Sequence, residues 1–395
     1  MILSEKFLKI NPSATLTIDA KFKQMKADGL DVVGFGAGEP DFDTPEHIKK
    51  AAIEAINDNK TRYTPASGTL ELKKAVCKKF KDDNGLDYDP SCIVVSNGAK
   101  HSLINAFGAI LNPGDEVIIP APFWVSYPEM VKYNDGVPVV LQTKEEEDFK
   151  FTAEEFESAI TDKTKAIVLN SPSNPTGMLY TEDELRAIAA VAVAHSIFVI
   201  SDEIYEKLVY DGKKHVSIAS LGDEIKDLTI VINGLSKTYA MTGWRIGFAA
   251  SNPQIAKLMS NVQSHTTSNP NSIAQAAAVA ALTGPAETVE TMRCAFDKRR
   301  KYMVERINSI DGVSARMPMG AFYVMMNIEK LIGRTIAGVK IENADDFANA
   351  FLDKCLVAVV PGTGFAAPNF VRWSYATSTK NIKEGLDRLE KFLKM

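Results

Sequence analysis

Six short apolar runs, separated by longer helical patterns, occupy the chain between about residues 93 and 250. They are Ile93–Val95, Val117–Ile119, Ala166–Leu169, Ile197–Ile200, Ile230–Ile232 and Ile246–Ala250. The runs are continuous rather than alternating, which is typical of strands that are buried on both faces. Such strands with helices between them predict a mainly parallel sheet in a three-layer α/β domain.

The pattern changes after about residue 290, and the 395 residues of the chain are too many for one ordinary domain. Two strand-like segments, Ala321–Met326 and Val357–Val360, and an amphipathic closing helix at Lys380–Lys394 predict a second, smaller α/β domain. We therefore expect an N-terminal segment (1–45) that joins this smaller domain, a large domain (46–290) and a small C-terminal domain (291–395).

Polar side chains follow four of the expected strands, at the point where each strand ends. They lie in the segments Ser96–Lys100 and Asn170–Gly177, at Asp202 and at Lys237. In open α/β sheets, ligands bind just beyond the carboxyl ends of the strands. Four polar elements at four strand ends predict a binding site at that edge of the sheet.

Lys237 lies in a turn of small residues directly after the run at 228–233, and Arg245 follows eight positions later. A surface charge explains this arrangement poorly. A lysine amine is nucleophilic once deprotonated, and its pKa falls readily on burial. Lys237 is therefore predicted to form a Schiff base with an aldehyde cofactor whose phosphate Arg245 holds, which indicates pyridoxal 5'-phosphate.

Asp202 places a carboxylate directly at a strand end. A buried aspartate beside the pyridine nitrogen of the cofactor would keep that nitrogen protonated, since opposite charges stabilise each other. The alternative is an aspartate that caps a helix. The Lys237 site, one strand later, favours the functional interpretation.

Two further side chains would contact the phenolic oxygen of the cofactor. Asn174, in the turn-rich segment 170–177, would bind that oxygen and a substrate carboxylate, and Tyr205 would donate a second hydrogen bond to the same oxygen. The alternative for 170–177 is an ordinary loop closed by proline and glycine.

A phosphate seat is expected where a strand gives way to a helix, at Gly98, Ala99 and Lys100. Backbone N–H groups and the helix dipole make such a turn suitable for an anion. Arg245 and the hydroxyl of Ser236 would add to it. Trp124 is either an aromatic that stacks on the cofactor ring or a core tryptophan.

Arg372 lies in the middle of an expected strand, in an apolar setting. A lone arginine there costs desolvation free energy unless it is paired. A bidentate contact with the α-carboxylate of a substrate would supply the pair. A structural ion pair is the alternative.

Composition excludes several other functions. The net charge of −5 gives no general attraction to nucleic acid or to a membrane. The four cysteines form no CxxC pair and the five histidines form no spaced metal cluster, and we expect neither a signal peptide nor a membrane span. The glycine-rich segment Gly34–Glu39 has no dinucleotide-type continuation. We expect a cytoplasmic protein without a metal.

Taken together, these motifs resemble those of the class I aminotransferases, which are fold-type I enzymes that depend on pyridoxal phosphate, and the bacterial-type aspartate aminotransferases in particular. The resemblance runs nearly end to end. Its segments are Pro12–Thr15, Gly36–Phe42, Tyr63–Pro65, Asn174–Gly177, Ser201–Tyr205, Ser236–Lys237, Met241–Gly247 and Pro361–Thr363.

The resemblance implies a large domain with a mainly parallel seven-stranded sheet, a smaller α/β domain and a homodimer. It assigns the proton transfer between substrate and cofactor to Lys237. Gly38, Trp124, Asn174 and Arg372 would bind the substrate. Tyr63 would reach the phosphate of the neighbouring subunit's cofactor. Lys100 and Thr15 match the lysine and threonine that bind the second carboxylate of a dicarboxylic amino acid.

The implied reaction is reversible transfer of the amino group from L-aspartate to 2-oxoglutarate, giving oxaloacetate and L-glutamate in two half-reactions. Another substrate (prephenate or arogenate, an aromatic amino acid, or alanine) is the first alternative. Prephenate users tend to carry a lysine where this chain has Asn11. Different chemistry with the same cofactor, such as C–S lysis or ring closure, and an inactive binding protein with this fold are further alternatives.

Overall fold

The computed structural model describes residues 3–12 and 14–395, without the side chains of residues 14–17 and 19. A seven-stranded sheet with the order β2-β8-β7-β6-β5-β3-β4 forms the centre of the larger part. Its strands are β2 (Ile93–Ser96), β3 (Glu116–Ala121), β4 (Val137–Gln142), β5 (Thr164–Asn170), β6 (Phe198–Asp202), β7 (Thr229–Gly234) and β8 (Gly247–Ala250).

The pairing within this sheet is mainly parallel. Strands β7, β6, β5, β3 and β4 pair in parallel from neighbour to neighbour. Only β8 runs antiparallel to its neighbours, β2 and β7. This confirms the predicted seven-stranded α/β sheet.

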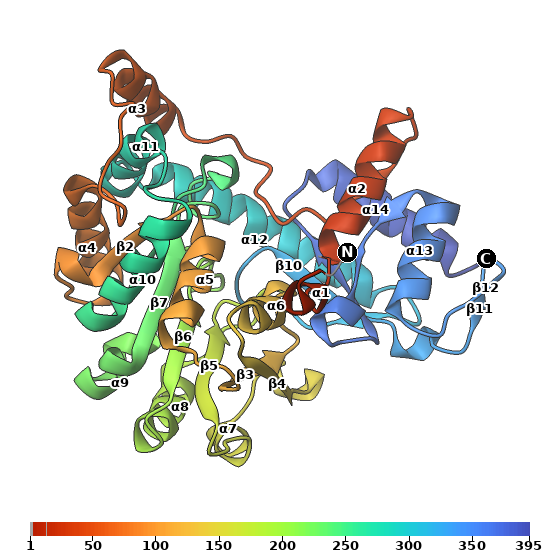
Figure 1. Ribbon diagram of the computed structural model, residues 1–395. Coiled ribbons are helices and arrows are strands. Elements are labelled where there is room, and N and C mark those ends of the chain that lie inside the picture. The colour runs from red at the N-terminus through yellow and green to blue at the C-terminus, as the bar shows by residue number, and fades with distance from the viewer. Residues whose placement is uncertain (1–2, 13) are drawn as a thin grey trace.

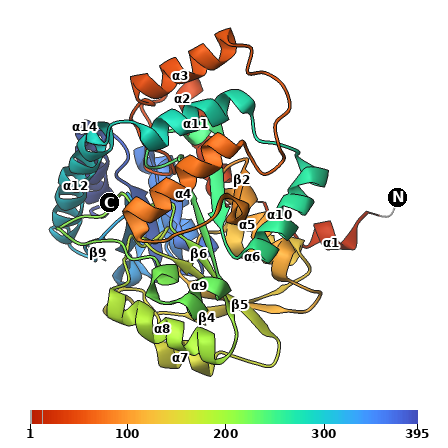
Figure 2. The ribbon, with the colours of Figure 1, turned by 90° about the vertical axis from the view of Figure 1, so that its left-hand side faces the viewer.

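Helices cover both faces of the sheet and make three layers (Figure 2). One face is covered by α5 (Ala99–Ile110), α6 (Ser126–Tyr133) and α10 (Pro253–Thr266). The other is covered by α3 (Glu46–Asn57), α4 (Leu70–Asn84), α7 (Ala153–Ser158), α8 (Glu182–Ala194), α9 (Asp223–Leu228) and α11 (Ser272–Thr283). Because both faces are covered, the strands can be apolar throughout, as their continuous runs predict.

Local signals fix where several of these helices begin and end. Helix α8 begins at a capping box in which Thr181 accepts a hydrogen bond from the N–H of Glu184 and the Glu184 carboxylate accepts one from the N–H of Thr181. Helix α4 ends at Gly85, which adopts the left-handed conformation that a side chain would disfavour. These caps set the helix ends next to the sheet.

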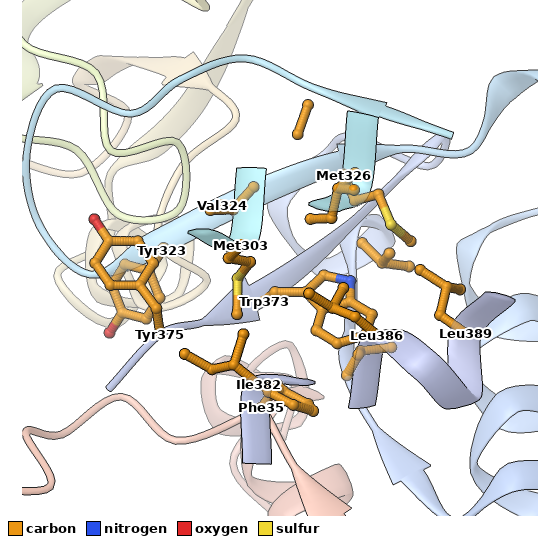
Figure 3. Packing of buried hydrophobic residues seen from close by; sticks show 14 of the residues in the cluster. Phe35, Met303, Tyr323, Val324, Met326, Trp373, Tyr375, Ile382, Leu386 and Leu389 are labelled. Atoms are coloured by element: carbon orange, nitrogen blue, oxygen red, sulfur yellow. The ribbon is translucent and has the colours of Figure 1, made fainter. Parts of the chain in front are cut away.

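The second part is built around an antiparallel sheet with the order β14-β15-β10-β9. Its strands are β9 (Ser314–Ala315), β10 (Tyr323–Asn327), β14 (Val360–Pro361) and β15 (Phe370–Ser374), and its helices are α12 (Glu287–Asn308), α13 (Ala344–Cys355) and α14 (Thr379–Phe392). A hairpin of β11 (Thr335–Ile336) and β12 (Val339–Lys340) lies beside them. Figure 3 shows its core, where Trp373 of β15 packs among Phe35, Leu386 and neighbouring side chains.

The N-terminal segment contacts both parts of the chain: Lys6 and Phe7 contact Asp135 and Tyr133 at the end of α6, whereas the segment from residue 14 onward lies with the second part. Helix α1 (Glu5–Leu8) is followed by α2 (Ala14–Ala27), which lies among the C-terminal elements in Figure 1. Strand β1 (Val33–Gly34) pairs in parallel with β13 (Val357–Ala358). Helix α12 runs across residue 290, so the domain boundaries at 45 and 290 stay a prediction. No helix among the described residues is long and apolar enough to span a membrane.

The structure differs from the expected strands in two places. Strand β4 was not predicted because it is an edge strand, with Val137 and Val140 exposed and without a buried apolar run. The segment Val357–Val360 was expected to be one strand, but it divides into β13, which pairs with β1, and β14, which pairs with β15.

Candidate active site

A cavity of about 420 Å³ opens between the carboxyl ends of the central strands and the second part of the chain. Asn170 of β5 lies opposite Asp202 of β6, and Asp202 lies opposite Ile232 of β7, so the three strands end at one edge. Most of the predicted site residues line this cavity: Gly38, Ala99, Lys100, Trp124, Asn174, Asp202, Tyr205, Ser236, Lys237, Arg245 and Arg372.

Lys237 follows β7 by three residues and is only part-buried, so its amine is open to the cavity. Its Nζ donates a hydrogen bond to the carbonyl oxygen of Gly38. Burial of the amine lowers the pKa of Lys237 to about 8, although the nearby Glu39 carboxylate opposes the shift. A substantial fraction of this amine is therefore neutral and nucleophilic near physiological pH.

Asp202 is almost fully buried at the end of β6. Its Oδ2 accepts a hydrogen bond of 2.7 Å from the hydroxyl of Tyr127, and its Oδ1 accepts one of 3.2 Å from the N–H of Ile204. Burial raises the pKa of Asp202 to about 6, and both hydrogen bonds oppose the rise. The four residues Ile204–Lys207 form a turn and not a helix, so the helix-cap alternative does not apply.

Arg372 of β15 is buried without an acidic partner among the described residues. Its guanidinium donates to Asn174 Oδ1 at 2.9 Å and to the carbonyl of Gly36 at 3.0 Å, and it lies 4.3 Å from the ring centroid of Tyr323. Its Nε has no hydrogen-bond partner. The structure therefore does not support a structural ion pair, which was the alternative interpretation of Arg372. Its positive charge is available to bind an anionic ligand.

Asn174 and Tyr205 converge on the same wall of the cavity. The backbone N–H of Asn174 donates to Asn170 Oδ1 at 2.7 Å, while the Asn170 amide donates to the carbonyl of Asp202 at 2.9 Å. The hydroxyls of Tyr205 and Tyr323 lie 3.0 Å apart. This network links the loop after β5 to the end of β6 and to β10.

The predicted phosphate turn meets Arg245 at the start of α5. Gly98 has a φ of +85°, which strongly favours glycine, and the Arg245 guanidinium lies where a Cβ would stand. Arg245 donates to the carbonyls of Thr242 and Asn97, at 2.9 and 3.4 Å, and has no carboxylate partner among the described residues. Guanidinium and helix N-terminus together make a site for an anion.

Lys100 and Trp124 lie side by side in the lining of the cavity. The Lys100 amine is 4.8 Å from the Trp124 ring centroid, and the Trp124 ring meets Tyr127 edge-on at 5.3 Å. Burial, and after it the positive charge of Arg245, lowers the pKa of Lys100. Trp124 packs against the core beside it and also lines the cavity, so the two interpretations of this residue are compatible.

Of the predicted residues, Gly98 and Tyr63 do not line the cavity, and Gly98 forms the turn directly before Ala99, which does. Tyr63 is 92% exposed and lies outside the lining of its own chain's cavity. Thr15 belongs to α2, but its side chain lies outside the described part of the structure. Their predicted roles stay predictions.

Sequence reasoning missed several residues that the fold brings into the site. Tyr127, Tyr323, Glu39 and Asn170 all line the cavity. Tyr127 lies in the first turn of α6, three residues after Trp124, and its N–H donates to the carbonyl of Trp124, so its nearness in sequence to Trp124 could have pointed to it. Tyr323 carries no such signal, because only the pairing of β10 with β15 brings it to Arg372.

A second cluster was also not foreseen, although its members are satisfied by one another. Glu203, Glu206 and His215 lie together beneath the site. Glu203 accepts from Ser217 at 2.6 Å and contacts His215 Nε2 at 3.0 Å, while Glu206 pairs with Lys79. Lys79 balances the charge of Glu206, and Ser201, Ser217 and His215 hold the Glu203 carboxylate, which favours a structural network.

The charges that line the cavity are unbalanced. Two carboxylates face four cationic side chains: Asp202 and Glu39 against Lys100, Lys237, Arg245 and Arg372. The excess of positive charge favours ligands with several anionic groups, because Arg372 is buried and neither Arg245 nor Lys100 has a carboxylate partner among the described residues.

Comparisons with known proteins agree with one another. The family model for aminotransferase class I and II matches residues 30–389. The chain is 50% identical over 393 residues to an aspartate aminotransferase of Bacillus subtilis (strain 168), covering 100% of this chain and 99% of the relative. It is 47% identical over 393 residues to an aspartate/prephenate aminotransferase of Cereibacter sphaeroides, covering 99% and 98% of the two chains. A solved structure, Thermus thermophilus aspartate aminotransferase with maleate, has 43% identity and a TM-score of 0.94 over 100% of both chains.

Proposed function

This chain belongs to the class I and II aminotransferases, and from that premise we propose that it is an aspartate aminotransferase. It transfers the amino group of L-aspartate to 2-oxoglutarate, reversibly, and gives oxaloacetate and L-glutamate. Its cofactor is pyridoxal 5'-phosphate, on which enzymes of this family depend.

The residues of the cavity fit this cofactor. The Arg245 guanidinium lies directly against the turn at Gly98, so a cation and the N-terminus of α5 come together where a phosphate would bind. The part-buried amine of Lys237 could form a Schiff base with the aldehyde of the cofactor, and the buried carboxylate of Asp202 could pair with its protonated pyridine nitrogen. Gly98, Ala99, Lys100, Ser236 and Arg245 would hold the phosphate, Trp124 the ring face, and Asn174 and Tyr205 the phenolic oxygen.

When bound, pyridoxal 5'-phosphate supplies an electron sink that acidifies the Cα–H bond of an amino acid. Lys237 Nζ moves that proton, as general base and then as general acid, and a pKa near 8 suits both roles. Asp202 holds the proton on the ring nitrogen. The Arg372 guanidinium, which donates to Asn174, would orient the α-carboxylate, and the backbone of Gly38 in the same cavity would bind it as well.

The preference for aspartate rests on Lys100. Its amine has no carboxylate partner among the described residues and faces the same cavity as Arg372, so two cations are available for two carboxylates. The Thermus thermophilus neighbour was solved with maleate, a dicarboxylate. Thr15, whose side chain is not described, would donate to the same distal carboxylate.

A homodimer would complete each site. Tyr63 is exposed on its own chain, and α3 on the same side carries the exposed apolar residues Ile53 and Ile56. Burial of such surface favours association. The phenol of Tyr63 would then reach the phosphate of the neighbouring subunit's cofactor. The four cysteines are free, which supports a reducing, cytoplasmic location.

Prephenate is the second candidate amino acceptor, because the Cereibacter sphaeroides relative is an aspartate/prephenate aminotransferase. Against it stands Asn11, where prephenate users tend to carry lysine. Asn11 is engaged by Glu129, which accepts from its backbone N–H at 3.0 Å and from its side-chain amide at 3.3 Å.

The substrate assignment is tested by Lys100→Ala. A charge-assisted contact with a distal carboxylate is worth about 1.5–3 kcal/mol, so kcat/KM for aspartate should fall by at least about tenfold. Alanine has no distal carboxylate, and its kcat/KM should change much less. The measurement is steady-state kinetics with aspartate, alanine, tyrosine and prephenate.

Lys144→Ala, which removes an exposed lysine that pairs only with Glu147, serves as the control. Equal losses for aspartate and alanine in Lys100→Ala would show that Lys100 serves the cofactor alone and would overturn the argument for aspartate.

A further inference from the structure

The segment 60–69 carries an exposed tyrosine, Tyr63, on a backbone that is held by several hydrogen bonds. Tyr63 is 92% exposed. Hydrogen bonds from side chains of α10 and α11 hold the residues on either side of it. A fixed backbone around an exposed aromatic ring is the arrangement expected of a residue that contacts another molecule, since pre-ordering removes an entropic cost of binding.

Gln275 of α11 holds this segment from one side and is almost fully buried. Its Oε1 accepts from the N–H of Thr69 at 2.8 Å, and its Nε2 donates to Thr64 Oγ1 at 3.0 Å and to the carbonyl of Pro270 at 2.9 Å. Ser272 adds a hydrogen bond to the carbonyl of Lys60 at 2.7 Å. The residues flanking Tyr63 are thereby fixed on both sides.

Gln263 of α10 is fully buried and uses its whole hydrogen-bonding capacity. Its Nε2 donates to the carbonyls of Ala66 at 2.6 Å and Val95 at 2.7 Å, and its Oε1 accepts from Ser96 Oγ at 2.7 Å and Asn105 Nδ2 at 2.9 Å. Ser96 ends β2 directly before the phosphate turn at Gly98. One amide therefore joins the Tyr63 segment to the phosphate turn of the same chain.

We propose that Gln275 and Gln263 are positioning residues for the cofactor phosphate, and that Gln275 acts on the site of the neighbouring subunit through Tyr63. The proposal rests on the proposed function and its homodimer. Among the described residues, the hydrogen bonds of the Gln275 side chain go to the Tyr63 segment and to the carbonyl of Pro270, so its influence is expected to cross to the partner's site. Gln263 touches both the segment and the turn, so its influence reaches both sites.

Hybrid dimers with a single live site test this proposal. One chain carries Lys237→Ala and the other keeps Lys237, so pyridoxal 5'-phosphate is captured covalently at one site only, and its affinity is read from the absorbance of that captured cofactor. Tyr63 of the Lys237→Ala chain serves this live site. Gln275→Met placed on the Lys237→Ala chain should weaken the cofactor affinity of the live site at least about threefold. A loss of this size corresponds to part of the free energy of the hydrogen bond between Tyr63 and the phosphate.

The reciprocal hybrid is the matched control. With Gln275→Met on the chain that keeps Lys237, the live site receives Tyr63 from the unsubstituted partner, and its affinity should stay unchanged. Gln263→Met should weaken the affinity in both arrangements, because its contact with Ser96 acts within its own chain. Equal effects of Gln275→Met in the two arrangements, or no effect in either, would overturn the proposal.

Two further variants separate positioning from general damage. Gln275→Met should add little to Tyr63→Phe in the same chain, because residues that act through one contact are not additive. Should Gln275→Met chains not assemble, Ser272→Ala removes an exposed anchor of the same segment and should show the same difference between arrangements. If the hybrid without Gln275 or Gln263 changes captures no cofactor, the proposed function itself fails.

Discussion

At the residue scale, Asp202 owes its charge state to opposing effects. Burial favours the neutral acid, while the hydroxyl of Tyr127 donates to the ionised form at 2.7 Å. The same tyrosine ring supports Trp124 edge-on. Tyr127 thus contacts both the carboxylate that would pair with the cofactor nitrogen and the indole that would face the cofactor ring.

Tyr127→Phe should raise the pKa of Asp202 above about 6, because the substitution removes a hydrogen-bond donor that stabilises the carboxylate. The substitution keeps the aromatic ring that packs against Trp124. The affinity of the cofactor-free enzyme for pyridoxal 5'-phosphate should fall as Asp202 becomes protonated at low pH. In Tyr127→Phe this fall should occur at a pH higher by about one unit, which is the effect of losing a charged hydrogen bond of this kind. Titrations from pH 5 to 8 measure it.

Tyr180→Phe is the control, because Tyr180 is equally buried but its hydroxyl accepts from the N–H of Phe151, away from Asp202. Its acid limb should match that of the unsubstituted enzyme. An unchanged limb in Tyr127→Phe would contradict the role given to this hydroxyl.

Lys237 gives a second pH-dependent prediction. Burial lowers its pKa to about 8, and only the neutral amine attacks an aldehyde. The rate at which the cofactor-free enzyme captures pyridoxal 5'-phosphate should rise with pH through about 8 and level off above it. Stopped-flow absorbance measures the rate, and a midpoint above 10, the ordinary range of lysine, would contradict the shift.

At the scale of elements, the central sheet could be predicted because its strands are buried on both faces and read as continuous apolar runs. Strand β4 escaped because Val137 and Val140 are exposed at the sheet edge. The division of Val357–Val360 into β13 and β14 depends on two different partner strands, β1 and β15, and a local apolar pattern carries no information about distant partners.

Gly247 shows how closely β8 meets the start of α5. It lies between Gly234 of β7 and Ser96 of β2, and a Cβ on it would collide with the backbone of Gly98 and Ala99. Gly247→Ala should therefore lower the free energy of unfolding by about 1–3 kcal/mol and weaken cofactor binding at the turn. Urea unfolding and a cofactor titration measure the two effects.

Gly243→Ala provides the comparison within the same segment, because a Cβ there meets nothing within 4 Å. Its free energy of unfolding should stay within about 0.5 kcal/mol of that of the parent. Equal stability of the two variants would show that the β8–α5 approach is looser than described.

At the scale of the whole molecule, the site draws on segments from residue 36 to residue 372. Lys237, Asp202, Asn174 and Arg372 could be predicted because their residue types and motifs carry chemical meaning. Tyr323 could not, since it reaches Arg372 only through the register of β10 and β15. The roles of Tyr63 and Thr15 depend on a second chain and on a side chain outside the described structure.

One cavity is expected to carry out both halves of an amino transfer with aspartate as donor. A spectral titration of the purified enzyme with L-aspartate alone tests it most directly. The absorbance of the pyridoxal form should fall, that of the pyridoxamine form should grow, and 2-oxoglutarate should reverse both. A bound cofactor that ignores aspartate but responds to alanine or tyrosine would contradict the substrate assignment, and the absence of any cofactor band would contradict the account of Lys237 itself.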